Sequence, residues 1–530
     1  MKTLRKVLGV MMVLALVLSI TVSAFADGVT VSYDGESAGS YKIYQIFSGT
    51  YDSTTKKLGS IEWGKGVNAA SFLSNLKEAG ILTSTTDAAG QPLSASAVAE
   101  LLSSISDNSE AALKVSKAAY ASLTDVYTTV SNDEAKTVDY GYYLLVEDGV
   151  GPDDVVNLPL LQFAGDSVTI KDKVDAPEFQ KKVQDSDDTA GTQTGWQDSA
   201  DWDIGDEVPF QLEATLPSTF TGFTSYKVVF HDKMSEGLTL IEGTGDHELT
   251  VSVAGKSYKL SELPKDGISF SKSGADGCTF EIAIDNVLAL GAAPSSKVTV
   301  NYWATLNDKA KIGAAGNPNE AKLQFSNNPN NEASTGETNW DKVIVFTYDL
   351  DVDKVDPNGK YLDGATFSLY KKVPAGTAGA VELTKGEGAI WVKIEQQDGT
   401  PGSEFYFKGL DDGDYRLVED SAPAGYNKAD PIDFTITADH DIVSDNPALK
   451  SVTAGSLSTN AGANGGVDGD VNPENGKRES NSVISTEVIN RTGVQLPSTG
   501  GIGTTIFYIV GGIMVAAAAL LLVTKRRMNG

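Results

Sequence analysis

The stretch Leu350-Asp351-Val352-Asp353-Lys354 alternates apolar and acidic residues and ends in a lysine. Side chains on a strand point alternately to opposite faces, so Leu350, Val352 and Lys354 share one face. Two of these three side chains are apolar, which predicts that this face packs against a core and that Lys354 points into it. Burying an ammonium group is costly unless it is paired, so this lysine needs partners inside the fold.

Two later segments of the same region supply candidate partners. In Tyr415-Arg-Leu-Val-Glu419 the glutamate alternates with apolar residues, and in Ile484-Ser-Thr-Glu-Val-Ile-Asn490 the asparagine lies in line with Ile484 and Val488. The alternation therefore predicts that a lysine, a glutamate and an asparagine point into one core from three different strands. For one such triple alone, a hydrogen-bonded lysine–carboxylate pair beside an amide is a sufficient interpretation.

A second region repeats the triple in the same strand order. Lys181 alternates with apolar residues on its first strand, Asp232 on a middle strand and Asn327 on its last strand. Lys182 and Asn328 are the alternatives, and the alternation favours Lys181 and Asn327. Because two regions carry the same triple, a shared chemical role is favoured over two unrelated pairings.

The composition narrows the possible functions. The chain has 530 residues, of which 41% are hydrophobic and 21% charged, in the range of globular domains. Its net charge of −29 argues against binding to nucleic acid. The three histidines form no motif or cluster with carboxylates, and no phosphate or dinucleotide fingerprint occurs, so we expect no metal and no cofactor. Cys278, the single cysteine, cannot form an intramolecular disulfide.

The N-terminus has the features of a secretory signal. A basic start precedes an apolar run from Val7 to Ile20 and a small-residue site that ends at Ala26. We expect residues 1–26 to be a signal peptide, with cleavage between Ala26 and Asp27. An exported protein of this size without disulfides must rely on its cores or on another kind of cross-link.

The C-terminus carries three features in order. The motif Leu496-Pro497-Ser498-Thr499-Gly500 comes first, an uncharged apolar segment covers residues 501–524, and a basic tail follows. The apolar segment is long enough to cross a hydrocarbon layer of roughly 30 Å as a transmembrane helix. Residues 495–530 thus resemble the LPXTG cell-wall sorting signal of Gram-positive surface proteins. The resemblance implies that a sortase cuts after Thr499 and passes its acyl group to an amine, so that the membrane anchor is temporary.

The remaining chain divides into three units. Residues 27–174 begin and end with strand-like alternation and carry a helical middle from about Val67 to Leu123. Residues 175–341 and 342–494 consist of short alternating segments separated by turn residues, the pattern of a sandwich. We therefore predict a mostly β protein of tandem immunoglobulin-like β-sandwich domains, the first with a helical insertion.

Both triples resemble the intramolecular isopeptide sites of Gram-positive pilins. The second unit resembles the fimbrial isopeptide-forming domain, and the third, with its box from Tyr415 to Tyr426, resembles the collagen-adhesin B-type repeat. The resemblance implies two self-formed amides, Lys181–Asn327 and Lys354–Asn490, promoted by the acids Asp232 and Glu419. Burial favours a neutral amine and a neutral carboxylic acid, so the amine can attack the asparagine carbonyl while the acid relays protons.

The resembling backbone pilins also carry an acceptor lysine in a V-x-V-Y-P-K motif at the end of their first domain. Residues 168–173 fall at that place, and Lys173 takes the lysine position. Lys171 and Asp172 replace the tyrosine and proline of the motif. We expect Lys173 to receive the acyl group of Thr499, with Lys171 as the alternative, and a charged strand end beside a linker is the other interpretation.

Together these features favour the major shaft subunit of a sortase-assembled pilus, secreted, attached to the cell wall and supporting adhesion. Its expected partners are a pilus-specific sortase, neighbouring copies of itself in a head-to-tail polymer, tip or base pilins, and peptidoglycan. We do not expect a turnover enzyme, because each amide forms once per fold. The alternatives are a monomeric LPXTG wall-anchored adhesin and a wall-anchored hydrolase, for which the sequence offers no catalytic cleft.

Overall fold

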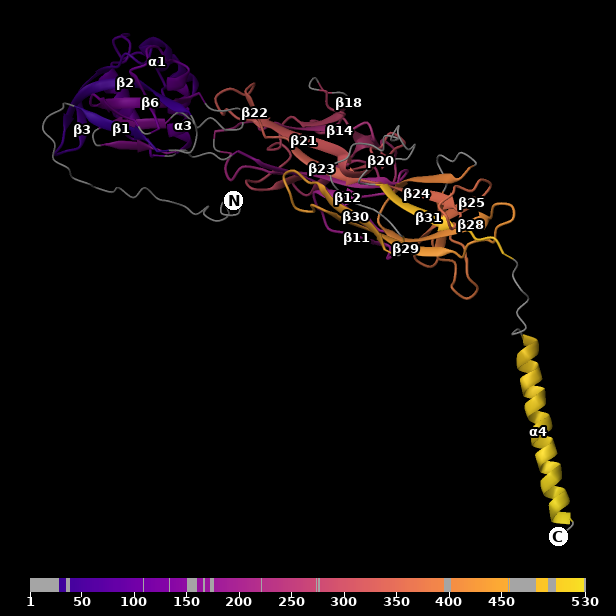
Figure 1. Cartoon of the computed structure of the whole chain (residues 1–530). Helices are drawn as coiled ribbons and strands as arrows, with labels where there is room; N and C mark the ends of the chain where they lie inside the picture. Colours follow the sequence, from indigo (N-terminus) through magenta and orange to yellow (C-terminus); the bar gives the residue numbers. More distant parts are fainter. Residues whose placement is uncertain are drawn as a thin grey trace.

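The structure is a computed structural model that describes residues 28–528 apart from gaps at 35–38, 108, 133, 150–159, 165–166, 172–175, 221, 273, 275–276, 395–401, 456, 458–482 and 494–501. Three β-rich units follow one another along the chain, and a separate helix, α4 (Ile502–Met528), lies at its C-terminal end (Figure 1). The expected signal peptide with Ala26 and Asp27, the residues Leu496–Gly500 and Lys173 lie outside the described residues.

The helix α4 covers the apolar segment in which the sequence predicts a transmembrane helix over residues 501–524. Within the part of the chain that the structure describes, no helix combines the length and the apolar character needed to cross a membrane. A helix therefore lies where the sequence predicts one, and its crossing of a membrane stays a prediction.

The first unit combines two sheets with three helices. Its elements are β1 (Val29–Tyr33), β2 (Ser40–Asp52), β3 (Lys57–Trp63), α1 (Ala69–Glu78), α2 (Ala95–Leu102), α3 (Glu110–Tyr120), β4 (Thr128–Ser131), β5 (Ala135–Val138), β6 (Gly141–Asp148), β7 (Leu160–Ala164) and β8 (Val168–Ile170). One sheet has the order β5-β1-β8, and the other has the order β3-β2-β6-β7 with β4 paired to β2. The predicted helical middle is confirmed. The residues Asn68, Ser94 and Ser109 cap the three helices by accepting a first-turn backbone N–H.

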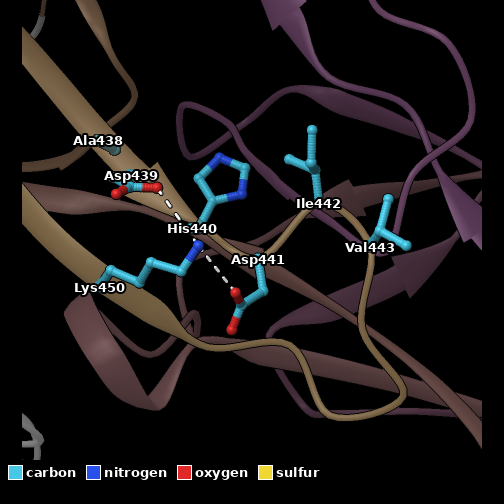
Figure 2. A pocket seen from close by; sticks show the side chains of 7 residues that line it. All are labelled: Ala438, Asp439, His440, Asp441, Ile442, Val443 and Lys450. Atoms are coloured by element: carbon cyan, nitrogen blue, oxygen red, sulfur yellow. Dashed lines mark ion pairs between the residues drawn. The ribbon is translucent and has the colours of Figure 1, made fainter. Parts of the chain in front are cut away.

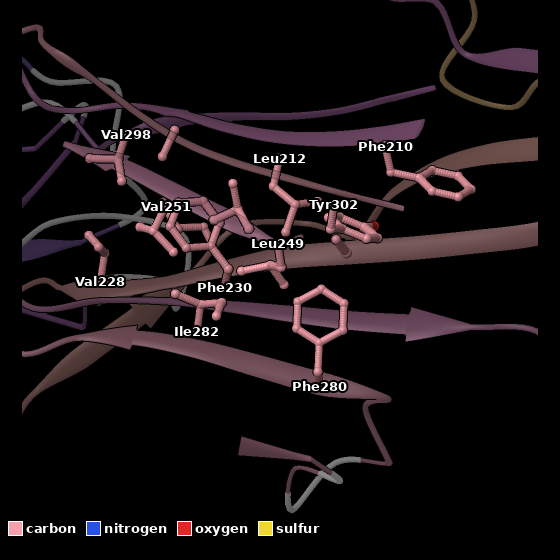
Figure 3. Close-up of a cluster of buried hydrophobic side chains, with 14 of the residues drawn as sticks. Phe210, Leu212, Val228, Phe230, Leu249, Val251, Phe280, Ile282, Val298 and Tyr302 are labelled. Atoms are coloured by element: carbon pink, nitrogen blue, oxygen red, sulfur yellow. The ribbon is translucent and has the colours of Figure 1, made fainter. Parts of the chain in front are cut away.

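The second unit consists of two main sheets packed face to face. Its elements are β9 (Glu178–Val183), β10 (Ser186–Asp187), β11 (Thr192–Gln193), β12 (Ser199–Asp201), β13 (Glu207–Thr215), β14 (Val228–Met234), β15 (Leu238–Leu240), β16 (Thr250–Val253), β17 (Lys256–Lys259), η1 (Leu260–Glu262), β18 (Ile268–Lys272), β19 (Phe280–Ile284), β20 (Lys297–Leu306), η2 (Gly313–Ala315), β21 (Asn317–Ser326), β22 (Thr335–Glu337) and β23 (Asp341–Phe346). One sheet has the order β17-β16-β20-β13-β9, and the other has the order β12-β23-β21-β14-β19-β18. Figure 3 shows their facing side chains, among them Phe210, Leu212, Phe230 and Ile282, which form one apolar core.

The last strand of this second sandwich is β23, which pairs with both β21 and β12. The sandwich therefore continues to Phe346, beyond the expected boundary at residue 341. The strand directly before Asn327, β21, is therefore not the last strand of the second unit, because β22 and β23 follow it.

The third unit contains a three-stranded and a five-stranded sheet. Its elements are β24 (Tyr348–Val355), β25 (Thr366–Lys372), β26 (Trp391–Ile394), β27 (Glu404–Leu410), β28 (Gly413–Ser421), β29 (Ile432–His440), β30 (Leu449–Gly455) and β31 (Val483–Ile489). The sheet orders are β27-β24-β31 and β26-β25-β28-β29-β30. Alternating residues such as Leu350, Val352, Leu417 and Ile484 fill the core between them. The first strand, β24, and the last, β31, are parallel neighbours.

The second and third units are joined by polar contacts as well as by the chain. The backbone N–H of Asp198 donates to the carbonyl of Ile442 at 3.0 Å, and that of Ile204 donates to the carbonyl of Gly409 at 2.9 Å. Lys371 of β25 reaches across to carboxylates of the second unit. These contacts make the two sandwiches one packed body (Figure 1).

Candidate functional site

In the third unit the structure brings the three predicted residues together. Lys354 lies on β24, Glu419 lies on β28 of the opposite sheet, and Asn490 follows β31 directly. Their exposed fractions are 0%, 2% and 1%, so all three are shielded from water. Lys354 is in register with Val488 on the parallel strand, which places Asn490 just past the lysine.

Hydrogen bonds orient this buried triple. The Asn490 amide Nδ2 donates to Glu419 Oε1 at 2.7 Å, and Lys354 Nζ lies 4.0 Å from the same oxygen. Lys354 Nζ also donates to the carbonyl of Val488, and Ala429 N donates to Glu419 Oε2 at 2.6 Å. Among the described residues the Asn490 carbonyl oxygen, Oδ1, has no hydrogen-bond partner. The amide that the lysine would attack is thus held by the glutamate, and its carbonyl oxygen is open.

In the second unit Lys181 and Asp232 are brought together, and a tyrosine joins them. Lys181 Nζ donates to Asp232 Oδ2 at 2.5 Å and to the Tyr302 hydroxyl at 2.7 Å. The Tyr302 hydroxyl donates to the same Asp232 oxygen at 2.6 Å. All three side chains are fully buried. Our sequence analysis missed Tyr302, although its alternation with Val298 and Val300 on β20 signals a buried phenol that needs polar partners.

The structure does not bring Asn327 to this site. The Asn327 side chain accepts a hydrogen bond from Ser334 at 2.7 Å and lines a pocket near the first unit. Asn319, at the other end of the same strand, is the amide that lies here: its Nδ2 donates to the Tyr302 hydroxyl at 3.0 Å, and its Oδ1 has no partner among the described residues. Eight strand residues separate the two asparagines, or roughly 26 Å at 3.3 Å per residue. The predicted Lys181–Asn327 pair is therefore corrected to Lys181 and Asn319.

The register of β21 explains the correction. By sequence alternation Asn319 and Asn327 both fall on the same face as Ala321, so alternation alone cannot separate them, whereas in the structure β21 ends at Ser326 and Asn327 lies beyond it. In the paired sheet Asp232 lies opposite Ala321, and Met234 lies opposite Asn319. The acid is therefore beside the start of β21, where Asn319 is fully buried, and far from its end.

Burial shifts the protonation of both lysines in the direction that amide formation needs. Desolvation lowers the pKa of Lys181, although the charge of Asp232 acts in the opposite direction. Desolvation also raises the pKa of Asp232, although the charge of Lys181 acts in the opposite direction. Desolvation also lowers the pKa of Lys354, against the charge of Glu419. Each amine is therefore more readily neutral, and hence more nucleophilic, than a lysine in water.

A third buried lysine, Lys371, has the opposite electrostatics. Its Nζ lies 2.5 Å from an oxygen of Asp411 and 2.7 Å from oxygens of Asp188 and Asp203. Burial opposes its charge, but Tyr415 and these carboxylates outweigh burial and raise the pKa of Lys371 well above its usual value. Lys371 is therefore a permanent cation that pairs with both units, and an ammonium group cannot attack a carbonyl.

The alternative residues have other partners. Lys182 pairs with Asp198 and its side chain is partly exposed, and Asn328 accepts a hydrogen bond from Asn330 N at 2.9 Å. Lys171 is exposed and lies 3.7 Å from Asp34 Oδ2. Lys171 is therefore accessible at the end of the first unit, whereas Lys173 is not described.

Family models match two parts of the chain. The model described as "SpaA: Prealbumin-like fold domain" matches residues 348–447, and "LPXTG cell wall anchor motif" matches residues 491–530. The second match confirms the predicted sorting signal, so the chain ends in the anchor of a Gram-positive cell-wall surface protein. The first match covers most of the third unit, from the start of β24 to the segment that follows β29.

A solved structure decides the fold of the whole chain. The T6 backbone pilin of serotype M6 Streptococcus pyogenes, described as a modular three-domain structure, superimposes with a TM-score of 0.51 over 89% of this chain and 100% of that chain, at 16% sequence identity. The chain has the fold of a Gram-positive backbone pilin. Within this pilin fold the comparison agrees with the mostly β architecture and with helices confined, before α4, to the first unit.

Two further proteins are similar to this chain. The trypsin-resistant surface T6 protein of Streptococcus pyogenes serotype M6 is 24% identical over 407 residues, which cover 67% of this chain and 70% of that protein. The full-length major pilin SpaD of Corynebacterium diphtheriae has a TM-score of 0.46 at 15% identity, covering 88% of this chain and 98% of that chain.

Proposed function

We propose that this chain is the shaft subunit of a covalently polymerised surface pilus that supports adhesion. The observation that carries the proposal is the pair of buried Lys–acid–Asn sites in tandem domains of a protein that ends in an LPXTG anchor motif. The backbone-pilin fold supports it further. In this interpretation the second and third units are immunoglobulin-like sandwiches, of which the third is of the prealbumin-like type.

Each buried site forms one amide in our proposal, Lys181–Asn319 and Lys354–Asn490. The neutral amine Nζ attacks the amide carbon Cγ, so that the Nζ–Cγ bond forms and the Cγ–Nδ2 bond breaks. The acid accepts a proton from Nζ and returns it to the leaving nitrogen, which departs as ammonia. Asp232 and Glu419 serve as these acids, and each acts once, so the protein is not a turnover enzyme.

The polymer itself needs a sortase and two ends of the chain. After removal of residues 1–26, a sortase cleaves between Thr499 and Gly500 and joins the Thr499 carbonyl to an amine of the next subunit. Lys173 is the proposed amine because it follows closely on Lys171, the last described residue of the first unit, which is exposed. The final subunit is passed to peptidoglycan, and tip or base pilins complete the fibre.

Polymerisation is tested in the native host by Lys173→Ala, with Lys171→Ala as the matched control. Boiled cell-wall extracts are separated by denaturing electrophoresis and probed for this protein. We expect a ladder of covalent polymers from the wild type and from Lys171→Ala, and only monomer from Lys173→Ala. A wild type that gives only monomer would identify a monomeric wall-anchored adhesin instead. Loss of the ladder in Lys171→Ala alone would move the acceptor to Lys171.

A further inference from the structure

One side-chain cluster at the junction of the second and third units contradicts our expectation that no histidine meets carboxylates. Asp185 follows β9, Asp201 ends β12, and His440 ends β29 of the neighbouring unit. One ligand atom from each lies within 4.8 Å of the others. His440 Nε2 is 3.4 Å from Asp201 Oδ1 and 3.8 Å from Asp185 Oδ2. Because His440 is more than 200 positions away from both aspartates in the sequence, no local motif could indicate the cluster.

The hydrogen bonds of His440 determine which ring nitrogen carries its proton. His440 Nδ1 lies 2.7 Å from Ser199 Oγ, and Ser199 Oγ lies 2.6 Å from the carbonyl oxygen of Asp441. A carbonyl oxygen only accepts, so the single hydroxyl proton of Ser199 goes to Asp441 and Nδ1–H must donate to Ser199. In the neutral ring, Nε2 therefore presents a bare lone pair toward the two carboxylates. Three electron-pair donors that converge in this way form a cation site.

The two carboxylates are held with one oxygen each toward His440. Asp185 Oδ1 accepts from the backbone of Ser186 at 3.0 Å and of Asp201 at 3.2 Å, and Asp201 Oδ2 accepts from the backbone of Asp412 at 3.2 Å. The other oxygen of each group is the one that faces Nε2. Asp201 is 2% exposed, so little water reaches its charge.

A buried hydroxyl lies on the same side of the cluster. Tyr348 is completely buried. Burial, then the charge of Asp201, a side-chain hydrogen bond with Asp201 and the charge of Asp185 raise the pKa of Tyr348 well above its usual value, so its hydroxyl lies beside these carboxylates. A phenol in this position helps to hold the Asp201 carboxylate next to His440.

The spacing and chemistry of the donors select the class of cation. Two ligands about 2.0–2.2 Å from a tetrahedral zinc ion lie roughly 3.3–3.6 Å apart, close to the separations seen around Nε2. Calcium and magnesium prefer sites made only of oxygen, whereas an imidazole nitrogen with carboxylates suits zinc and similar transition metals. A pocket of about 470 Å³ lies next to His440 (Figure 2) and is lined by Ala438, Asp439, His440, Asp441, Ile442, Val443 and Lys450.

We propose that Asp185, Asp201 and His440 bind a zinc-class divalent cation that bridges the second and third units. The neighbouring carboxylate cluster of Asp188, Asp203 and Asp411 is an internal comparison, because Lys371 already supplies its cation. The proposed ion supplies the positive charge for Asp185 and Asp201, as Lys371 does for the neighbouring cluster. The ion site is independent of the cross-linking sites.

Isothermal titration of the EDTA-treated full chain with ZnCl₂ tests the proposal. His440→Asn removes Nε2 but keeps a side-chain N–H that can donate to Ser199, and circular dichroism of the variant checks its fold. The matched control is His247→Asn, because His247 is exposed and pairs with one carboxylate only, Glu207. We expect one tight site in the wild type and in His247→Asn. His440→Asn should weaken binding by about 100-fold or more, at least as much as loss of an outer partner.

Cobalt and calcium provide a second readout that does not depend on folding of a variant. Co²⁺ bound to the wild type should give the intense visible absorption of four-coordinate cobalt, and excess Zn²⁺ should remove it. Asp201→Asn should weaken this signal as His440→Asn does. Absence of zinc binding to the wild type, equal binding by His440→Asn, or preference for Ca²⁺ over Zn²⁺ would each overturn the proposal.

Discussion

Replacing Asn319 with alanine separates the cross-link that we infer in the second unit from the one that the strand pattern alone predicts. Each amide releases one ammonia and removes about 17 Da from the intact mass. A wild-type chain with both bonds is therefore about 34 Da lighter than its plain sequence. Asn319→Ala should keep only the deficit of the third unit, about 17 Da, whereas the matched control Asn327→Ala should keep about 34 Da.

The expected loss of stability follows from the size of the loop that the bond closes. A bond from Lys181 to Asn319 closes about 140 residues, for which the chain-entropy treatment of a cross-link gives about 5 kcal/mol at 25 °C. For a domain of 150–250 residues, about 1 kcal/mol shifts the melting temperature by about 2–4 °C. Asn319→Ala should therefore lower the melting transition of the second unit by about 10–20 °C. The Lys181–Asp232 pair remains, so the sandwich should still fold.

Intact-mass spectrometry and scanning calorimetry of the same purified samples measure both effects. A full deficit in Asn319→Ala together with a halved one in Asn327→Ala would refute our reading of the β21 register. A wild-type mass equal to that of the unmodified chain would refute the chemistry itself. A normal mass deficit without the thermal shift would refute only the entropy argument.

Three further predictions concern single side chains. Glu419→Ala should abolish the 17 Da deficit of the third unit, about half of the total, in the same mass measurement. Lys371→Ala leaves three carboxylates at the junction without their cation and should cost about 3–5 kcal/mol in denaturant unfolding, whereas Lys372→Ala, at a half-exposed pair, should cost less than about 1 kcal/mol. Burial and the charges of Asp203 and Asp188 raise the pKa of Asp206 to about 7, against the charge of Lys371. The folded state therefore holds this proton more tightly than the unfolded state, so the stability that it contributes is complete below about pH 4 and is lost as the pH rises to about 7. Asp206→Asn should flatten that part of the profile of melting temperature against pH, and an unchanged profile would contradict the assignment.

Strand periodicity was sufficient for most of the fold because alternation reports directly which face is buried. The segments around Lys354, Glu419 and Asn490 became strands whose inward faces meet, and their register needed only the parallel neighbours β24 and β31. The helical middle of the first unit could equally be predicted from the sequence, since its periodicity and the capping side chains of Asn68 and Ser94 are local features.

What could not be predicted depends on register and on contacts between units. By sequence alternation Asn319 and Asn327 fall on the same face, so only the extent of β21 and its pairing with β14 distinguish them. Tyr302 completes the site from β20, two strands away from Lys181 in the same sheet, and no local pattern links this tyrosine to a lysine on β9. His440 meets Asp201 only because two separate sandwiches pack together.

The strand β23 follows the proposed Lys181–Asn319 cross-link of the second unit and precedes Lys354. This position determines how we expect the protein to respond to tension. A pull on the chain ends passes from Lys181 through the proposed amide to Asn319, and from Lys354 to Asn490. The chain between the two bonded residues of each pair therefore carries no force and stays folded. At 3.3–3.6 Å per residue each loop would otherwise release roughly 450–490 Å. The segment from 320 to 346 lies outside both loops, and its strands β21 and β23 remain in the line of force, held by hydrogen bonds and core packing and by no covalent cross-link in our proposal. That segment, of roughly 90–100 Å, is the extensible element of the two-sandwich body.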